Sequence, residues 1–170
     1  MDRRLLLGLL CAAGIAPRAL ATAPGEVPVG GLLRDAPLRG LNGPSRRHAD
    51  YRGRPLLSNV WASWCGPCRG ETASLERLAW SEPARAFGII GISTDDYVER
   101  AQAWLAQSNA TISHYIDQQL QLENLLGASR LPLTVLVGAD WRVRAKVYGA
   151  REWDSPAAVA AIRRAFAPAA

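Results

Sequence analysis

Hydrophobic residues gather in two short, mostly apolar runs near the middle of the chain, as is typical of strands buried inside a sheet. One run covers residues 56–61 and the other covers residues 87–92, and neither contains a charged residue. Strands that are covered on both faces show continuous apolar runs of this length. Between the runs, apolar and small side chains recur from Cys68 to Ala79 at helical spacing. The pattern therefore predicts a strand, a helix and a second strand in succession.

The rest of the chain continues to alternate between helical and strand patterns, and a short edge strand is predicted before it, over residues 38–41. In chain order the later elements are predicted to be a helix over 98–105, a short strand over 111–116, a short helix over 120–126, a strand over 133–137, an antiparallel strand with one wet face over 143–148, and a last helix over 155–166. Together they predict an α/β fold with a mixed central sheet and helices on both of its faces.

The N-terminal residues form a separate segment with its own composition. Arg3 and Arg4 precede an apolar run over residues 5–16, and Ala19-Leu20-Ala21 then offers a cleavage site of the small-x-small type. The run is shorter than the roughly 20 residues that cross a bilayer. Residues 1–21 are therefore interpreted as a cleaved signal peptide that directs the protein to the periplasm. The paired arginines also fit the twin-arginine export route.

After cleavage the chain is predicted to contain one domain. Residues 22–34, rich in proline and glycine, are expected to form a flexible leader, and residues 35–170 a single compact domain. We expect a monomer with no stable insertion in the membrane. The net charge is +5, but the basic residues are scattered along the sequence rather than interleaved with aromatic residues. This distribution argues against nucleic acid as a partner.

Cys65 and Cys68 lie where the first predicted buried strand gives way to a helix. Cys65 falls at the helix N-terminus, where free N–H groups and the helix dipole stabilise a thiolate, so we interpret it as the nucleophile. Cys68 lies one turn further on the core-facing side and would resolve the mixed disulfide. Gly66 and Pro67 shape the turn and are expected to tune the reduction potential. Trp64 is expected to face substrate, with ordinary packing as the alternative.

Other interpretations of the two cysteines remain open at this stage. A disulfide across so short a loop could be purely structural, although it would add little stability through loop entropy. A zinc site needs about four ligands, and only His48 and His114 are available beside the cysteines, so no metal site is predicted. A copper-carrying protein that uses both cysteines and His114 is the alternative from another functional class. An oxidising enzyme of the same fold is a further alternative.

The segment Trp61–Arg69, Trp-Ala-Ser-Trp-Cys-Gly-Pro-Cys-Arg, resembles the thioredoxin superfamily and, within it, the TlpA/ResA-like branch of exported thiol-disulfide oxidoreductases. The resemblance extends from about Asp35 to the C-terminus and includes Tyr51–Pro55 and Leu131–Thr134. It implies a thioredoxin fold without a cofactor. It also implies a periplasmic enzyme that reduces disulfides in client proteins such as apocytochrome c. A membrane reductase would supply the thiols that recharge it.

The resemblance also implies roles for residues outside the cysteine pair. In the family, a cis proline before the hairpin lies against the active disulfide, and this position is Pro132 here. The backbone of Leu131 would then pair with a substrate strand. The branch often places an acidic residue after the second central strand, where this chain has Asp95. We hypothesise that Asp95 assists proton transfer at Cys68. The alternative is that it caps the helix that follows.

Overall fold

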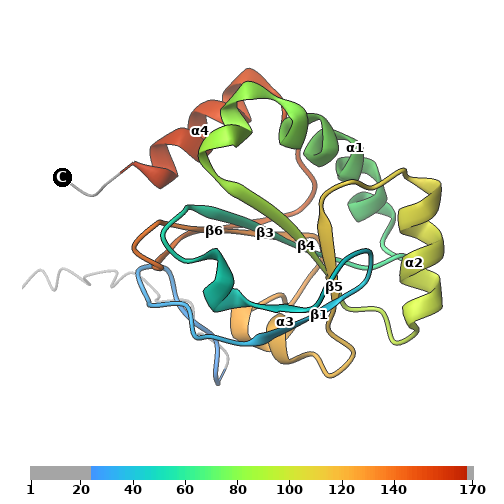
Figure 1. Ribbon diagram of the computed structural model, residues 1–170. Helices are drawn as coiled ribbons and strands as arrows, with labels where there is room; N and C mark the ends of the chain where they lie inside the picture. Colours follow the sequence, from blue (N-terminus) through green and yellow to red (C-terminus); the bar gives the residue numbers. More distant parts are fainter. Residues whose placement is uncertain (1–23, 168–170) are drawn as a thin grey trace, which may run out of the picture.

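A seven-stranded mixed sheet forms the centre of the protein, in the strand order β2-β1-β5-β4-β3-β6-β7 (Figure 1). The computed structural model describes residues 24–167. The elements are β1 (Pro37–Gly40), β2 (Arg46–Arg47), the 3-10 helix η1 (His48–Tyr51), β3 (Leu56–Trp61), α1 (Gly66–Trp80), the 3-10 helix η2 (Glu82–Ala86), β4 (Gly88–Ser93), α2 (Val98–Gln107), β5 (Ser113–Ile116), α3 (Gln121–Leu126), β6 (Leu133–Val137), β7 (Val143–Tyr148) and α4 (Pro156–Phe166). Strands β3, β4 and β5 run parallel to one another, whereas β6 pairs antiparallel with both β3 and β7.

Strand β3 shows how the two faces of the sheet are filled. Successive side chains of a strand point to opposite faces. Leu56 and Val60 contact the cluster that includes α3, whereas Leu57 contacts side chains of α1 and α4, and Trp61 contacts those of α2. Helices α1, α2 and α4 thus cover one face, and α3 covers the other (Figure 1). The predicted α/β sheet with helices on both faces is confirmed.

The edge of the sheet differs from the prediction. The strand predicted for residues 38–41 is β1, but it lies between β2 and β5 rather than at the edge. Strand β2 occupies the edge, where Arg46 and Arg47 pair with Leu38 and Pro37. Two exposed arginines in succession give no apolar pattern, so periodicity alone did not indicate this strand.

The described part of the predicted leader packs against the domain rather than remaining loose. Val27 and Leu33 are buried, at 5% and 1% exposure. The backbone N–H groups of Gly30 and Leu33 donate to the carbonyls of Val143 and Trp141, at 2.7 and 2.9 Å. An ion pair between Glu26 and Lys146 covers part of the β7 face that was expected to be exposed to solvent. The predicted signal peptide over residues 1–21 lies outside the described residues.

The predicted helices form, and their ends follow local chemistry. Helix α4 begins at Pro156, and the Ser155 hydroxyl oxygen accepts a hydrogen bond from the backbone N–H of Ala158 at 3.2 Å. Helix α3 ends at Gly127, whose φ of 78° lies in the left-handed region that glycine tolerates. Over residues 24–167, no helix is both long and apolar enough to cross a membrane.

Candidate redox-active site

Cys65 and Cys68 form a disulfide at the junction between β3 and α1. Cys65 is the N-cap residue of α1, and its Sγ accepts a hydrogen bond from the backbone N–H of Cys68 at 3.2 Å. Pro67 lies in the first helical turn, where its missing N–H breaks no helical hydrogen bond. The sulfur of Cys65 therefore sits at the positive end of a 15-residue helix.

The two sulfurs differ in their access to solvent. Cys65 is 6% exposed and Cys68 is 1% exposed, so the outer and inner positions follow the predicted order. Even the outer cysteine, Cys65, is largely buried while it is bonded to Cys68. The neighbouring Trp64 is 70% exposed. A large aromatic surface therefore stands free beside the disulfide.

The Leu131–Pro132 peptide bond is cis, which confirms the isomer predicted for Pro132. Leu131 is half-buried and packs against the cluster that contains both cysteines. The carbonyl of Pro132 accepts a hydrogen bond from the backbone N–H of Gly149 at 2.9 Å. This bond holds the proline loop, which borders the disulfide, to the residue that follows β7.

Asp95 fastens the segment before Cys65 to the end of β4. Its buried carboxylate accepts hydrogen bonds from the Ser63 N–H at 2.8 Å, the Ser63 hydroxyl at 2.6 Å and the Ser93 hydroxyl at 2.7 Å. The capping interpretation is wrong, because the N-cap of α2 is Tyr97 and no side chain caps that helix. A role for Asp95 in proton transfer at Cys68 stays a prediction.

Glu71 is a buried acid near the disulfide to which the sequence gave no role of its own. It lies three residues after Cys68 on α1, is 2% exposed, and so faces the core on the same side of the helix. Its carboxylate accepts hydrogen bonds from Asn59 Nδ2 at 2.6 Å, the Arg151 N–H at 3.0 Å and Trp153 Nε1 at 3.0 Å. Burial raises the pKa of the Glu71 carboxyl, against the opposing effect of these donors. A charged residue at a core-facing helical position was the signal available in the sequence.

The copper interpretation required His114 to join the two cysteines. His114 is 3% exposed, and its Nδ1 accepts a hydrogen bond from Trp61 Nε1 at 3.1 Å. Burial lowers the pKa of His114 to about 3, so its ring is neutral at neutral pH. Within the described part of the chain, no three side chains of histidine, cysteine or acidic residues form a group that could hold a metal. The three proposed copper ligands are therefore not brought together.

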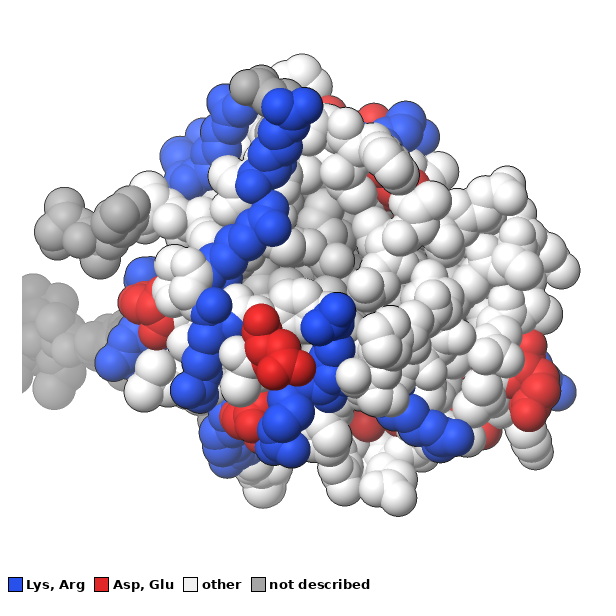
Figure 2. Space-filling model, in the orientation of Figure 1, with Lys and Arg blue, Asp and Glu red and all other residues white. Residues whose placement is uncertain are grey.

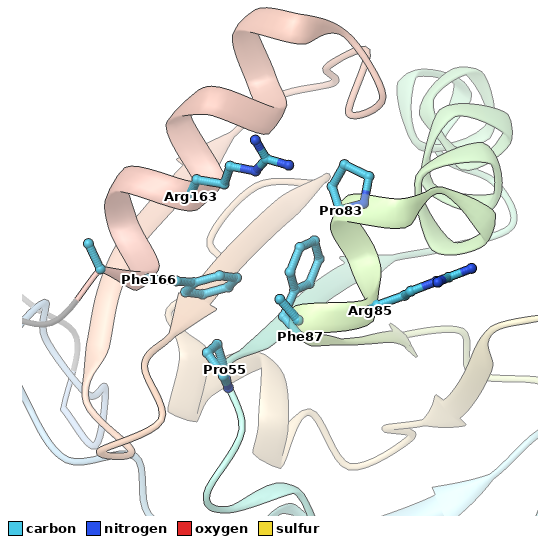
Figure 3. Close-up of a pocket in the computed structure, with 8 residues that line it drawn as sticks. Pro55, Pro83, Arg85, Phe87, Arg163 and Phe166 are labelled. Carbon is cyan, nitrogen blue, oxygen red and sulfur yellow. The ribbon is translucent and has the colours of Figure 1, made fainter.

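A pocket of about 590 Å³ lies at the other end of the sheet, between η2 and α4. In Figure 3 the rings of Phe87 and Phe166 face its interior, with Pro55 below and Arg163 reaching across toward Pro83. Figure 2 shows basic side chains in a band over this face, from the region of α4 and η2 downward. The pocket contains no cysteine, histidine or acidic residue in its lining, so we place the redox chemistry at the disulfide.

A family model described as the AhpC/TSA family matches residues 29–146, which is well over half of the chain. The chain belongs to the AhpC/TSA family. The thiol-disulfide oxidoreductase ResA of Geobacillus thermodenitrificans is 29% identical to it over 146 residues, covering 85% of this chain and 84% of ResA. The thiol:disulfide interchange protein DsbE of Pseudomonas aeruginosa is 33% identical over 138 residues, covering 78% of this chain and 74% of DsbE.

Solved structures place this AhpC/TSA chain in the same group. A structure described as a DsbE-type thiol:disulfide interchange protein from Chlorobium tepidum superimposes with a TM-score of 0.72 at 25% identity, over 82% of this chain and 96% of the other. A secreted disulfide oxidoreductase of Mycobacterium tuberculosis has the same fold, with a TM-score of 0.64 at 23% identity over 74% and 95% of the two chains. The predicted thioredoxin-like fold is confirmed, and the protein is a thiol-disulfide oxidoreductase of the ResA/DsbE type with a Cys-X-X-Cys pair.

Proposed function

We propose that this oxidoreductase acts in the periplasm as a dithiol reductant of disulfides in client proteins, with apocytochrome c as the first candidate client. The observation that carries the proposal is the position of Cys65 Sγ at the start of α1, where the Cys68 N–H donates to it. The same hydrogen bond and the helix dipole would stabilise a Cys65 thiolate after the disulfide is reduced. A thiolate is the species that attacks a disulfide.

The reduced enzyme would work in two exchange steps. The Cys65 thiolate attacks one sulfur of the client disulfide, the client S–S bond breaks, and a mixed disulfide forms while the client's other sulfur leaves as a thiolate and takes up a proton. Cys68 then loses its proton and attacks Cys65 Sγ, which releases the second client thiol. Two electrons pass from the Cys65–Cys68 pair to the client. A membrane reductase that supplies thiols would restore the dithiol.

The residues around the disulfide suit the binding of an extended client segment. We assign Leu131 and Pro132 to the backbone contact with the client strand, because their loop borders the cysteines and is held by Gly149. Trp64 would cover the apolar part of the client, since 70% of its surface is free. Gly66 and Pro67 would tune the potential through the turn that joins the two sulfurs.

The direction of electron flow is tested by the equilibrium of the full chain with glutathione buffers. A reductant should have a potential below about −200 mV, and the oxidising alternative requires a value well above it. The fraction of Cys65–Cys68 disulfide at each buffer ratio is measured by alkylation and mass spectrometry. A potential near that of the strong oxidant class, about −120 mV, would overturn the reducing assignment.

The client class is tested by trapping. Cys68→Ser removes the resolving thiol, so mixed disulfides with Cys65 should accumulate in periplasmic extract, and apocytochrome c should be among them. Cys65→Ser is the matched control, because it keeps one thiol but removes the nucleophile, and it should trap nothing. Equal trapping by both variants would contradict the assignment of Cys65 as the attacking residue.

A further inference from the structure

Tyr148, the last residue of β7, contacts the residues at both ends of the loop that carries the cis proline. This loop, residues 128–132, joins α3 to β6, and we call it the cis-proline loop. The Tyr148 hydroxyl donates a hydrogen bond at 2.8 Å to the carbonyl of Gly127, the residue before the loop. The Tyr148 backbone pairs with Leu133, the residue after the loop, in the antiparallel ladder of β6 and β7. The start and the end of the loop are therefore tied to one residue of β7.

The inside of the cis-proline loop is attached to the same part of the chain. The Arg130 guanidinium lies over the Tyr148 ring, 4.9 Å from the ring centre. Gly149, the residue after Tyr148, donates its N–H to the Pro132 carbonyl at 2.9 Å. Two consecutive residues thus hold the loop, and Tyr148 supplies both of the side-chain contacts, one through its hydroxyl and one through its ring.

The acceptor of the Tyr148 hydroxyl is itself fixed in place. Gly127 ends α3 with a φ of 78°, and its N–H donates to the Glu123 carbonyl at 2.9 Å. A Cβ at Gly127 would collide with the Glu26 carboxylate, which forms an ion pair with Lys146 on β7. Helix α3, the N-terminal segment and β7 therefore meet at Gly127, and the hydrogen bond from Tyr148 ends on a fixed point.

The cis-proline loop also presents backbone groups that the fold leaves unused. Within residues 24–167, neither the N–H nor the carbonyl of Leu131 has a backbone hydrogen-bond partner. Leu131 packs against the cluster that contains both cysteines, so these groups lie beside the disulfide. A free N–H and a free carbonyl are what an extended client segment needs for strand pairing. Because Leu131 has no such bond of its own, its position depends on the contacts that hold the residues around it.

Resting on the proposed function, we infer that Tyr148 is a positioning residue for client binding, which holds the cis-proline loop so that Leu131 can pair with a client strand beside Cys65. Tyr148 acts through the loop rather than on the reacting sulfurs. When a binding loop spends time in other conformations, the affinity falls in proportion to the fraction that remains competent. One hydrogen bond changes such an equilibrium by a factor of about five, and an exposed arginine–ring contact changes it by a factor of about two to five.

The test compares two disulfides that differ in whether they offer a peptide backbone. One is an uncharged peptide whose central cysteine is joined to 2-mercaptoethanol, and the other is hydroxyethyl disulfide, in which two mercaptoethanol units are joined. Reduction of each disulfide by the reduced full chain is followed by acid quench and chromatography. The ratio of the peptide rate constant to the hydroxyethyl disulfide rate constant measures how much the contact with the peptide backbone contributes.

Two substitutions at Tyr148 should lower this ratio in graded steps. Tyr148→Phe removes only the hydroxyl bond to Gly127 and should lower the ratio about fivefold. Tyr148→Leu also removes the ring beneath Arg130 and should lower the ratio about tenfold or more. Tyr148→Phe keeps the packing of the ring, so it carries the test even where Tyr148→Leu does not fold.

Tyr51→Phe is the matched control for the loss of one hydroxyl. Tyr51 packs against the same core cluster as Tyr148, and its hydroxyl is hydrogen-bonded to that of Tyr115 at 2.5 Å. Tyr51→Phe should lower the free energy of unfolding as Tyr148→Phe does, but it should leave the substrate ratio at the wild-type value. An unchanged ratio in Tyr148→Phe, or an equal fall in Tyr51→Phe, would overturn the inference alone. Failure of the wild type to reduce either disulfide would instead overturn the proposed function.

Discussion

The Asp95 carboxylate links the segment that follows β3 to the end of β4, and Asp95 is therefore the first residue to test. Asp95→Ala leaves the Ser63 N–H and the hydroxyls of Ser63 and Ser93 without their acceptor. Buried donors without a partner are costly, so the free energy of unfolding should fall by roughly 2–4 kcal/mol. The segment that leads to Cys65 should also loosen, and alkylation of reduced Cys65 by iodoacetamide should change its rate and its pH dependence.

The neighbouring Asp96 supplies the control for this change. Asp96→Ala removes the same charge one position along, but Asp96 is exposed. It should leave both the unfolding free energy and the Cys65 alkylation profile close to those of the wild type. If alkylation of Cys65 is the same in Asp95→Ala as in Asp96→Ala, Asp95 stabilises the fold without positioning the nucleophile.

Glu71 is expected to make stability depend on pH in a defined direction. Burial raises the pKa of Glu71 above 4.5, so the native state binds this proton more tightly than the unfolded chain does. The contribution of Glu71 to the free energy of unfolding therefore falls as pH rises from 4.5 through the raised pKa. Glu71→Gln has no carboxyl to titrate at this position. The free energy of unfolding of the oxidised wild type, minus that of oxidised Glu71→Gln, should fall over that window and stay constant at higher pH.

Urea unfolding of the two oxidised proteins across the acid and neutral range measures this difference. Comparison with Glu71→Gln isolates Glu71 from the other buried groups that titrate in the same range. Glu99→Gln on α2 is the control for the loss of one carboxylate, since Glu99 is exposed. A flat difference curve for Glu71→Gln would show that the Glu71 pKa is the same in both states.

At the residue scale, the cysteine pair could be predicted from the sequence, whereas the network of buried hydrogen bonds beneath it could not. Cys65 and Cys68 are predictable because one helical turn separates them and a buried strand precedes them. The contacts of Glu71 with Asn59 and Trp153 join residues that lie 12 and 82 positions apart. Periodicity reports which face of an element is buried, and it does not report which distant donor will meet a buried acceptor.

At the scale of elements, the N-terminal segment offers a test with an internal control. Leu33 is 1% exposed within the central cluster, while its neighbour Leu32 is 56% exposed. Leu33→Ala should lower the free energy of unfolding by about 2–5 kcal/mol, because it leaves a cavity in the core. Leu32→Ala should change it by less than about 0.5 kcal/mol. Guanidinium unfolding followed by tryptophan fluorescence measures both variants.

This comparison decides whether residues 24–34 belong to the folded domain. A loose leader predicts that neither substitution matters, whereas a packed segment predicts that only Leu33 does. Proline and glycine in this segment gave the expectation of flexibility, since both interrupt regular structure. The long-range hydrogen bonds to Val143 and Trp141 are made by its backbone, and a pattern of side chains carries little information about such contacts. The regular helices and long strands, by contrast, follow directly from their apolar spacing.

At the scale of the whole molecule, two buried histidines in separate layers make the free energy of unfolding depend on pH in the acid range. His114 lies beside Trp61, whereas His48 lies beside Trp141, and the His48 and Trp141 ring centres are 6.4 Å apart. Burial lowers the pKa of His48 to about 4 and that of His114 to about 3, both from 6.5. At these two histidines the unfolded chain therefore binds more protons than the native protein between about pH 4 and 6.5, so their contribution to the free energy of unfolding falls as pH falls through this window.

The two histidines should respond differently to replacement, which separates titration from hydrogen bonding. Neither ring nitrogen of His48 has a hydrogen-bond partner among residues 24–167, so His48→Leu should cost little at pH 7. It should also remove up to about 3 kcal/mol of the acid-induced loss, from the pKa shift of His48. His114→Leu leaves Trp61 Nε1 without its acceptor and should cost about 1–3 kcal/mol at pH 7.

Urea unfolding of both oxidised variants at pH 7 and at about pH 4.5 measures these effects together. A large loss in His48→Leu at pH 7, with the acid response unchanged, would show that the His48 ring is hydrogen-bonded in solution and is not a source of the acid response. Of the two histidines, His114 would then be the source of the acid response. Because His114 packs beside Trp61 in the cluster that contains both cysteines, acid would in that case loosen the protein first around the disulfide.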